Sequence, residues 1–97
     1  MVLRDGRFKM DTLTTNELFV LNQLLENHDG EDLTSPYGSQ NYPNEVCPIG
    51  WNAQQRGGLI SSLLKKGFVN IYNGKEYSLG CDVITITEDG INALKAA

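Results

Sequence analysis

Apolar residues recur at helical spacing in the first third of the chain. After the run Thr14-Thr15-Asn16-Glu17, leucines return every three or four residues, at positions 18, 21, 24 and 25. Thr14 fits the N-cap of a capping box, and Glu17 is placed to reach back to it. Gly30 suits the left-handed position that follows many helices. The pattern predicts a helix over residues 15–28, with His28 at the end where a cation interacts well with the helix dipole.

A second helical pattern follows Asn52. Asn52 is a good N-cap, and Gln55 stands where a capping box has its glutamine or glutamate. The apolar stripe of this helix consists of Leu59, Ile60, Leu63 and Leu64. Lys65 and Lys66 would occupy the last turn, where cations favour the dipole. Gly67 fits the position after the helix, and Phe68 would make the apolar contact that often closes this motif.

Two glycines interrupt the interior of this predicted helix. Gly57 and Gly58 each cost about 1 kcal/mol relative to alanine at such positions. A close approach of another backbone is the usual compensation for a helical glycine. We therefore expect something to approach the helix closely at this point.

A hairpin and a short helix are predicted for the rest of the chain. Residues 68–72 and 83–86 are rich in β-branched and aromatic side chains, and Asn73-Gly74 between them is a strong turn signal. The two strands would pair as a hairpin whose tip is residues 73–81. Thr87 would then cap a last helix, with acids in its first turn and apolar contacts from Ile91 and Leu94.

The segment 29–51 has a different character. It contains Pro36, Pro43 and Pro48, and each proline disfavours helix before it. We expect mostly loop, with at most one short helical turn near residues 44–47. An ordered loop is favoured over disorder because the segment carries apolar and aromatic anchors, namely Tyr37, Tyr42, Val46, Ile49 and Trp51.

Two runs resemble a known family. Residues 59–69, LISSLLKKGFV, resemble the end of a recognition helix and the first wing strand of winged helix-turn-helix regulators. Residues 84–94, ITITEDGINAL, resemble the return strand and closing helix of the MarR-type branch. The resemblance covers roughly residues 14–30 and 52–94. Segment 29–51 occupies the place of the family's second helix and is atypical for it.

The resemblance implies an α+β fold of the winged helix-turn-helix type. Such a domain has a small three-helix core and a C-terminal β-hairpin wing. The length of 97 residues suits one domain, so we expect residues 1–97 to form a single winged-helix domain. These runs recur in many winged-helix proteins, so they specify the fold better than the function.

The charge is unevenly distributed along the chain. The net charge is −4, and residues 1–50 contain three basic and eight acidic residues. The stretch 52–75 contains four basic residues and no acidic residue. An acidic protein can bind a polyanion through such a stretch, with modest affinity and a shallow salt dependence.

Several classes of function are disfavoured by the sequence. No nucleophile–base pair, metal-ligand spacing or phosphate loop is present, so we expect neither an enzyme nor a bound cofactor or metal. Cys47 and Cys81 are expected to be free thiols of a reducing cytosol. No apolar run approaches the roughly 20 residues of a membrane span, and the start lacks a signal peptide. The expectation is a cytoplasmic protein without a membrane partner.

The second helix has a polar side with chemistry suited to DNA. At about 100° per residue, the apolar side holds Ala53, Gly57, Ile60, Leu63 and Leu64, with Leu59 at its edge. The opposite side holds Gln54, Gln55, Gly58, Ser61, Ser62 and Lys65. Glutamine can pair with adenine edges, serine can reach bases or phosphates, and lysine can reach phosphates. At the wing tip, Asn73 and Lys75 could contact the minor groove or phosphates. Small polar residues are also ordinary choices for a surface that faces solvent only.

Two further residues near this helix favour a structural interpretation. Arg56 projects to the rim of the apolar side, which favours a packed or ion-paired arginine that braces the 29–51 loop. Trp51 is expected to anchor the core rather than to stack on a ligand.

The leading hypothesis is a DNA-binding domain of a small transcriptional regulator, with double-stranded DNA as its partner. A homodimer and a protein partner both stay open. The alternative is a winged-helix protein-interaction module without a DNA role, suggested by the acidic total charge and by Tyr37 and Tyr42 in the long loop. A third reading is an acidic DNA mimic that occupies a partner's nucleic-acid site.

Overall fold

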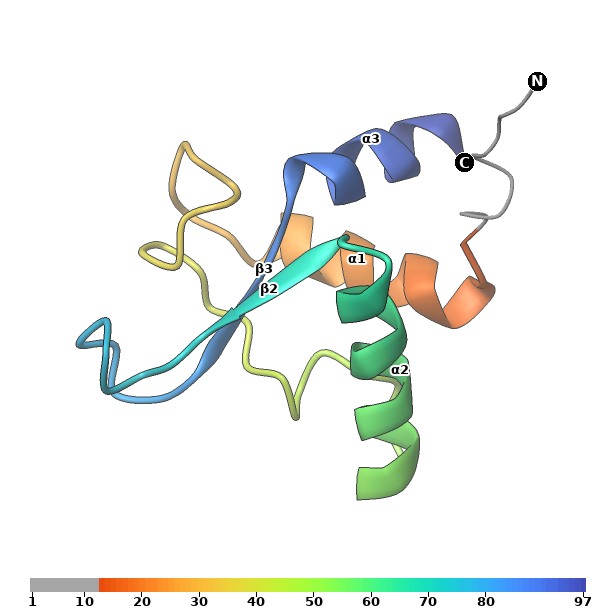
Figure 1. Cartoon of the computed structure of the whole chain (residues 1–97), viewed down its shortest axis with the longest axis horizontal. Helices are drawn as coiled ribbons and strands as arrows, with labels where there is room; N and C mark the ends of the chain where they lie inside the picture. Colours follow the sequence, from red (N-terminus) through yellow and green to blue (C-terminus); the bar gives the residue numbers. More distant parts are fainter. Residues whose placement is uncertain (1–12) are drawn as a thin grey trace.

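Three helices pack around a two-stranded antiparallel hairpin in the computed structural model, which describes residues 13–97 (Figure 1). The elements are α1 (Thr15–Glu26), α2 (Ala53–Lys65), β2 (Val69–Tyr72), β3 (Val83–Ile86) and α3 (Glu88–Ala96). This order confirms the expected α+β architecture with three helices and one hairpin. Residues 1–12 lie outside the described residues. The expectations about their charged side chains and about a signal peptide therefore have no structural counterpart here.

α1 begins as predicted and ends earlier than predicted. Thr14 Oγ1 accepts from the Glu17 backbone N–H at 3.1 Å, and Glu17 Oε1 accepts from the Thr14 N–H at 2.9 Å. The helix stops at Glu26, and Gly30 is not among the glycines with positive φ. The predicted end at residue 28 is therefore wrong. The cause is long-range pairing, because the Asn27 carbonyl accepts from the Gln40 N–H at 3.1 Å and draws the chain away from the helix.

His28 lies beyond α1 and organises the following loop. It forms an isolated antiparallel bridge with Ser39. Its Nδ1 accepts from the Gly30 backbone N–H, and its Nε2 lies 3.0 Å from the Ser35 carbonyl oxygen. Both contacts are satisfied together when the ring is neutral and carries its proton on Nε2. The expected role of His28 at a helix end is replaced by this role in the loop.

Both ends of α2 confirm the sequence signals. Asn52 and Gln55 form the predicted capping box. At the other end the Phe68 N–H donates to the Leu63 carbonyl and the Gly67 N–H to the Leu64 carbonyl, each at 3.0 Å. Gly67 has a φ of 77°, which a residue without a Cβ adopts at no steric cost. This pair of bonds is the helix end that Gly67 and Phe68 predict.

The hairpin pairs β2 with β3 in the register Val69↔Ile86 to Tyr72↔Val83. All four β3 residues are buried. At the base of the hairpin, the Thr87 backbone N–H donates to the Phe68 carbonyl at 3.0 Å, and Thr87 Oγ1 caps α3 by accepting from Gly90 N–H at 3.0 Å. A Cβ on Gly90 would lie 2.3 Å from the Phe68 carbonyl oxygen. Glycine at this position therefore allows α3 to pack directly on the hairpin backbone.

Segment 29–51 is an ordered loop that lies beside β3. The Ile84 N–H donates to the Asn41 carbonyl at 3.1 Å, and Ser39 Oγ donates to the Ile84 carbonyl at 3.2 Å. The buried Asn41 side chain donates to the Leu24 carbonyl. The segment contains no helix, and at residues 42–45 the chain makes only a turn. The prediction of mostly loop is confirmed.

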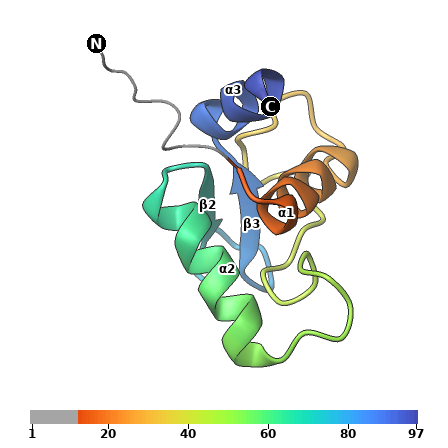
Figure 2. The same cartoon turned by 90° about the vertical axis from the view of Figure 1, so that its right-hand side faces the viewer.

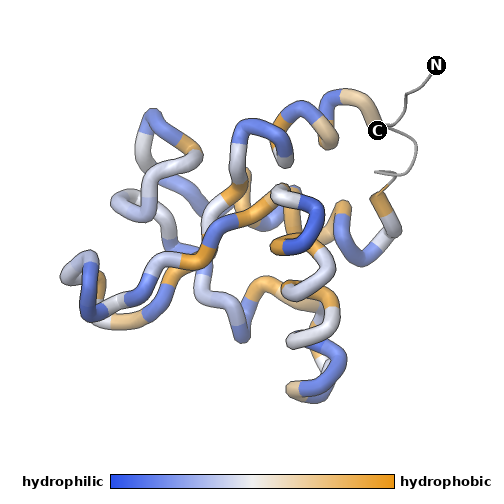
Figure 3. Tube along the Cα trace, in the orientation of Figure 1, coloured by the Kyte–Doolittle hydropathy of each residue, from blue (hydrophilic) through white to orange (hydrophobic). Residues whose placement is uncertain are grey.

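One apolar core joins all of these parts. Figure 3 shows apolar positions along the elements that meet at the centre of the molecule. Trp51 is partly buried against the core, as expected. The buried members come from α1, the loop, α2 and the hairpin, namely Val20, Leu21, Leu24, Val46, Cys47, Leu59, Ile60, Leu63, Phe68, Val69, Ile84 and Ile86.

Candidate nucleic-acid interface

α2 buries only part of the predicted apolar side. Its buried residues are Leu59, Ile60 and Leu63. Leu59 is thus central to the packed side rather than at its edge, while Leu64 is 42% exposed and Ala53 and Gly57 are exposed. The prediction is confirmed for Ile60 and Leu63, and the buried face is rotated from the predicted one towards Leu59. The reason is that no helix from segment 29–51 covers the Ala53, Gly57 and Leu64 side of α2.

Four of the predicted contact residues form one exposed line along α2. Gln54, Gly58, Ser61 and Lys65 follow one another at intervals of four, three and four residues, and all are exposed. We call these four residues the α2 stripe. In Figure 2, α2 runs along one side of the hairpin, and its first turn lies at the end of the molecule away from α3. The stripe contains no acidic residue.

Two predicted contact residues have side-chain hydrogen bonds to other residues of the chain. The side-chain oxygen Oε1 of Gln55 accepts from the Asn52 backbone N–H at 3.0 Å and belongs to the helix cap, although Gln55 itself is exposed. Ser62 is half-buried, and its hydroxyl donates to Glu17 Oε2 at 2.7 Å. Ser62 therefore faces α1 rather than outwards, because the first turn of α1 packs against the end of α2. The predicted outer face of α2 was wrong at this position.

Glu17 ties the start of α1 to the end of α2. It is only 1% exposed, and Lys66 Nζ lies 2.8 Å from its Oε1. Burial by itself raises the pKa of this carboxyl. Hydrogen bonds from Lys66, the Thr14 backbone and Ser62, together with the Lys66 charge, outweigh burial and hold the pKa below the usual glutamate value. The carboxylate stays ionised and fixes the orientation of α2.

The basic stretch 52–75 presents fewer free charges than its sequence implies. Arg56 Nη1 donates to the Trp51 carbonyl, which confirms that Arg56 braces the end of the long loop. Arg56 Nε is buried without a hydrogen-bond partner among residues 13–97. Lys66 is engaged by Glu17. Of the four basic residues in this stretch, Lys65 and Lys75 are the exposed ones.

The glycine pair of α2 faces open space. An added Cβ at Gly57 or at Gly58 would meet no atom of the described chain within 4 Å. The expected close approach is therefore not supplied by the part of the protein that the structure describes. No contact within the described residues explains why two exposed positions of a helix are glycine.

The predicted wing-tip contacts lie apart from the α2 stripe. Figure 1 shows the hairpin tip extending away from α2. Asn73 caps the tip, since its Oδ1 accepts from the N–H groups of Lys75 at 2.9 Å and Glu76 at 3.1 Å. Asp82 Oδ1 accepts from the Gly74 N–H at 2.9 Å. Lys75 thus has the acids Glu76 and Asp82 as neighbours at this end of the molecule.

Exposed tyrosines connect the long loop to the hairpin. Tyr37 is 58% exposed, and its hydroxyl donates to the Tyr77 carbonyl at 3.1 Å. Tyr77 packs edge to face on Tyr72, with ring centroids 5.1 Å apart. Tyr42 is also exposed. The interaction hypothesis for Tyr37 and Tyr42 requires such exposure.

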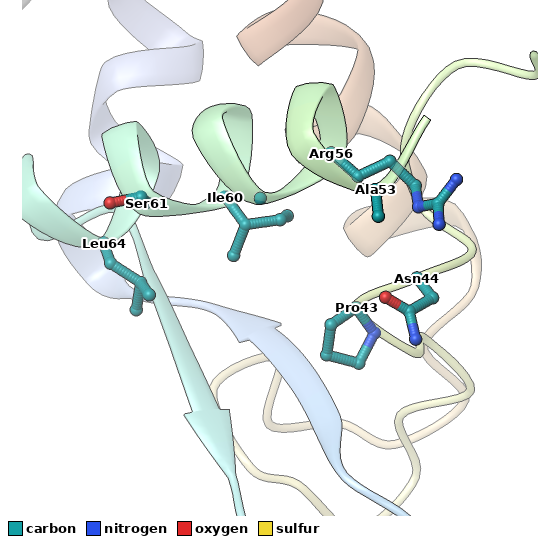
Figure 4. A pocket seen from close by; sticks show the side chains of 8 residues that line it. Pro43, Asn44, Ala53, Arg56, Ile60, Ser61 and Leu64 are labelled. Atoms are coloured by element: carbon teal, nitrogen blue, oxygen red, sulfur yellow. The ribbon is translucent and has the colours of Figure 1, made fainter. Parts of the chain in front are cut away.

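A shallow groove that the sequence did not predict runs beside the stripe (Figure 4). One wall is formed by Pro43 and Asn44, which belong to the long loop. The other wall belongs to α2 and consists of Ala53, Arg56, Gly57, Ile60, Ser61 and Leu64. The helical spacing of the α2 residues could have indicated one wall. The loop wall depends on a long-range contact that no local pattern encodes.

Other chemistry in the described residues is limited. Among residues 13–97, no three His, Cys, Asp or Glu side chains gather to hold a metal ion. Cys47 and Cys81 are free, and burial raises the pKa of the Cys47 thiol although the nearby Arg56 charge opposes this. No helix within residues 13–97 is long and apolar enough to cross a membrane.

Comparison of the chain with protein families, with curated proteins and with solved structures finds no significant match.

Proposed function

We propose that this protein binds double-stranded DNA through the α2 stripe and acts as a small transcriptional regulator of the winged-helix type. The observation that carries the proposal is the glycine pair. Gly57 and Gly58 weaken the helix, are exposed, and have no neighbour within 4 Å of an added Cβ. A ligand that approaches the helix backbone closely gives these glycines a purpose.

The dimensions of α2 suit a DNA groove. Its 13 residues correspond to a length of about 20 Å. The major groove of B-form DNA is about 12 Å wide and admits one α-helix. Because Gly57 and Gly58 carry no side chains, the diameter of α2 is smaller near its middle. The helix backbone can therefore enter the major groove more deeply there than a helix with side chains at these positions.

The charges support a weak phosphate contact rather than a strong one. Lys65 lies at the end of the stripe and is free to meet a phosphate. Glu76 and Asp82 at the hairpin tip would repel phosphates, so we place Asn73 and Lys75 outside the primary contact. With Lys65 alone engaged, the logarithm of affinity should fall against the logarithm of salt concentration with a slope of about −1.

The salt slope provides the test of this proposal. Fluorescence anisotropy of labelled duplex fragments is measured from low to moderate salt for the wild type, Lys65→Ala and Lys95→Ala. Lys95 is an exposed lysine on α3 and serves as the matched control. Lys65→Ala should weaken binding and reduce the slope by about 1, while Lys95→Ala should leave both unchanged. Equal effects of the two variants would contradict an interface on α2.

A protein-interaction module is the second candidate function. The observations that favour it are the exposed Tyr37 and the groove between Pro43 and α2. Under this alternative, Tyr37→Ala and Tyr42→Ala abolish capture of a protein partner and leave the folded state intact. Under the DNA proposal, neither variant changes duplex binding.

A further inference from the structure

The two glutamines of α2 differ in what their side chains are free to do. The side-chain oxygen Oε1 of Gln55 accepts from the Asn52 backbone N–H in the helix cap. The Gln54 side chain is exposed, and no described group donates to it or accepts from it. Gln54 is therefore the amide on α2 whose donor and acceptor are both available to a ligand.

The other polar residues of this helix are less able to distinguish bases. Ser62 donates to Glu17 and faces inward. Ser61 offers a rotating hydroxyl that suits either a base or a phosphate. Lys65 lies in the last turn and carries a compact charge on a flexible stem, which suits a phosphate oxygen.

Gln54 also has the position that base reading requires. It is the second residue of α2, and the first turn lies at the end of the molecule away from α3 (Figure 2). Residues near the start of a recognition helix are the ones that reach base edges. A glutamine amide fits adenine in particular, because its oxygen accepts from the adenine N6 amino group and its nitrogen donates to N7.

We propose that Gln54 sets the sequence preference of this protein by pairing with one adenine in the major groove. This inference rests on the proposed DNA-binding function. One turn further along α2, Gly57 and Gly58 offer no side chain to read a base. Ser61 lies seven residues after Gln54, about 10 Å further along the helix axis. The recognised site should contain one strongly preferred adenine followed by tolerant positions.

The experiment is selection from a randomised duplex library, followed by sequencing of the bound fraction. The wild type should prefer adenine at one position over the other bases by roughly five- to 150-fold, the range of a bidentate contact. Gln54→Ala should lose this preference and keep most of its affinity for random duplex. Gln54→Glu should shift the preferred base towards cytosine, whose N4 amino group donates to a carboxylate.

Gln55→Ala is the matched control for these variants. It removes the neighbouring amide and half of the capping box, so it should lower thermal stability and leave the adenine preference unchanged. An adenine preference that persists in Gln54→Ala, or that disappears in Gln55→Ala, would overturn the inference. If the wild type binds duplex without any base preference, this inference fails and the proposed function stands. If the folded wild type binds no duplex at low salt, both fail.

Discussion

Replacing the α2 glycines by alanine should strengthen the fold and weaken the function. An added Cβ at Gly57 or Gly58 meets open space, so the change carries no internal steric cost. Each alanine removes a helix penalty of about 1 kcal/mol. For a domain of this size, such a gain raises the melting temperature by about 4–8 °C. Against DNA, each new methyl group would crowd a close contact at a cost of about 1–3 kcal/mol, roughly five- to 150-fold in affinity.

Thermal unfolding by circular dichroism and duplex binding by anisotropy are measured on the same protein samples. Asn22→Ala is the control, since Asn22 is exposed on α1 and its replacement improves helix propensity away from α2. Asn22→Ala should gain stability without losing affinity. Glycine variants that gain stability and bind duplex as tightly as the wild type would refute a close approach at α2. Glycine variants with a lower melting temperature than the wild type would contradict the open space around Gly57 and Gly58, on which the expected gain in stability is based.

Three further predictions concern the stability of the fold. Gly90→Ala should lower the free energy of unfolding by at least about 2 kcal/mol in urea titrations, because the new Cβ would lie 2.3 Å from the Phe68 carbonyl oxygen. His28→Ala should cost about 1–3 kcal/mol and speed hydrogen exchange at the Gly30 amide, since it removes two hydrogen bonds. Glu17→Gln should cost about 2–4 kcal/mol near neutral pH. Because the folded pKa of Glu17 is lowered, its contribution is complete above the unfolded pKa and is lost as the pH falls through the folded pKa. Urea midpoints should therefore fall more steeply in acid for the wild type than for Glu17→Gln.

Local signals were the most predictable part of this molecule. The capping boxes at Thr14 and Asn52 and the helix end at Gly67 each depend on a few neighbouring residues, and all three form as expected. These three features are readable because their partners lie only a few positions apart in the chain. The hairpin was readable for another reason, since its two strands follow one another in the chain and a strong turn signal at Asn73 separates them.

Long-range contacts caused the differences. α1 ends early because the segment near Gln40 pairs with Asn27, thirteen positions away in the chain. Ser62 faces inward because Glu17 accepts its hydroxyl proton across 45 positions. The rotation of α2 follows from the same cause, since a loop rather than a helix lies beside it. Helical spacing defines which residues share a face, but only the neighbouring elements decide which face is buried.

The candidate site was therefore predictable in part. Gln54, Gly58, Ser61 and Lys65 share the exposed line that helical spacing indicates. Ser62 faces α1 through its hydrogen bond to Glu17, whereas Gln55 stays exposed with its side-chain oxygen held in the helix cap. Asn73 and Lys75 stay predictions at a hairpin tip that they share with two acids.

DNA binding through the α2 stripe is tested most directly by mapping the DNA contact on the protein. Isotope-labelled wild-type protein is titrated with a short duplex at low salt, and amide chemical shifts are followed by nuclear magnetic resonance. Binding through the α2 stripe should give the largest shifts in residues 53–65, along the line from Gln54 to Lys65. Shifts that concentrate instead in the loop 29–41 and the hairpin tip, or no shifts in a folded sample, would contradict it.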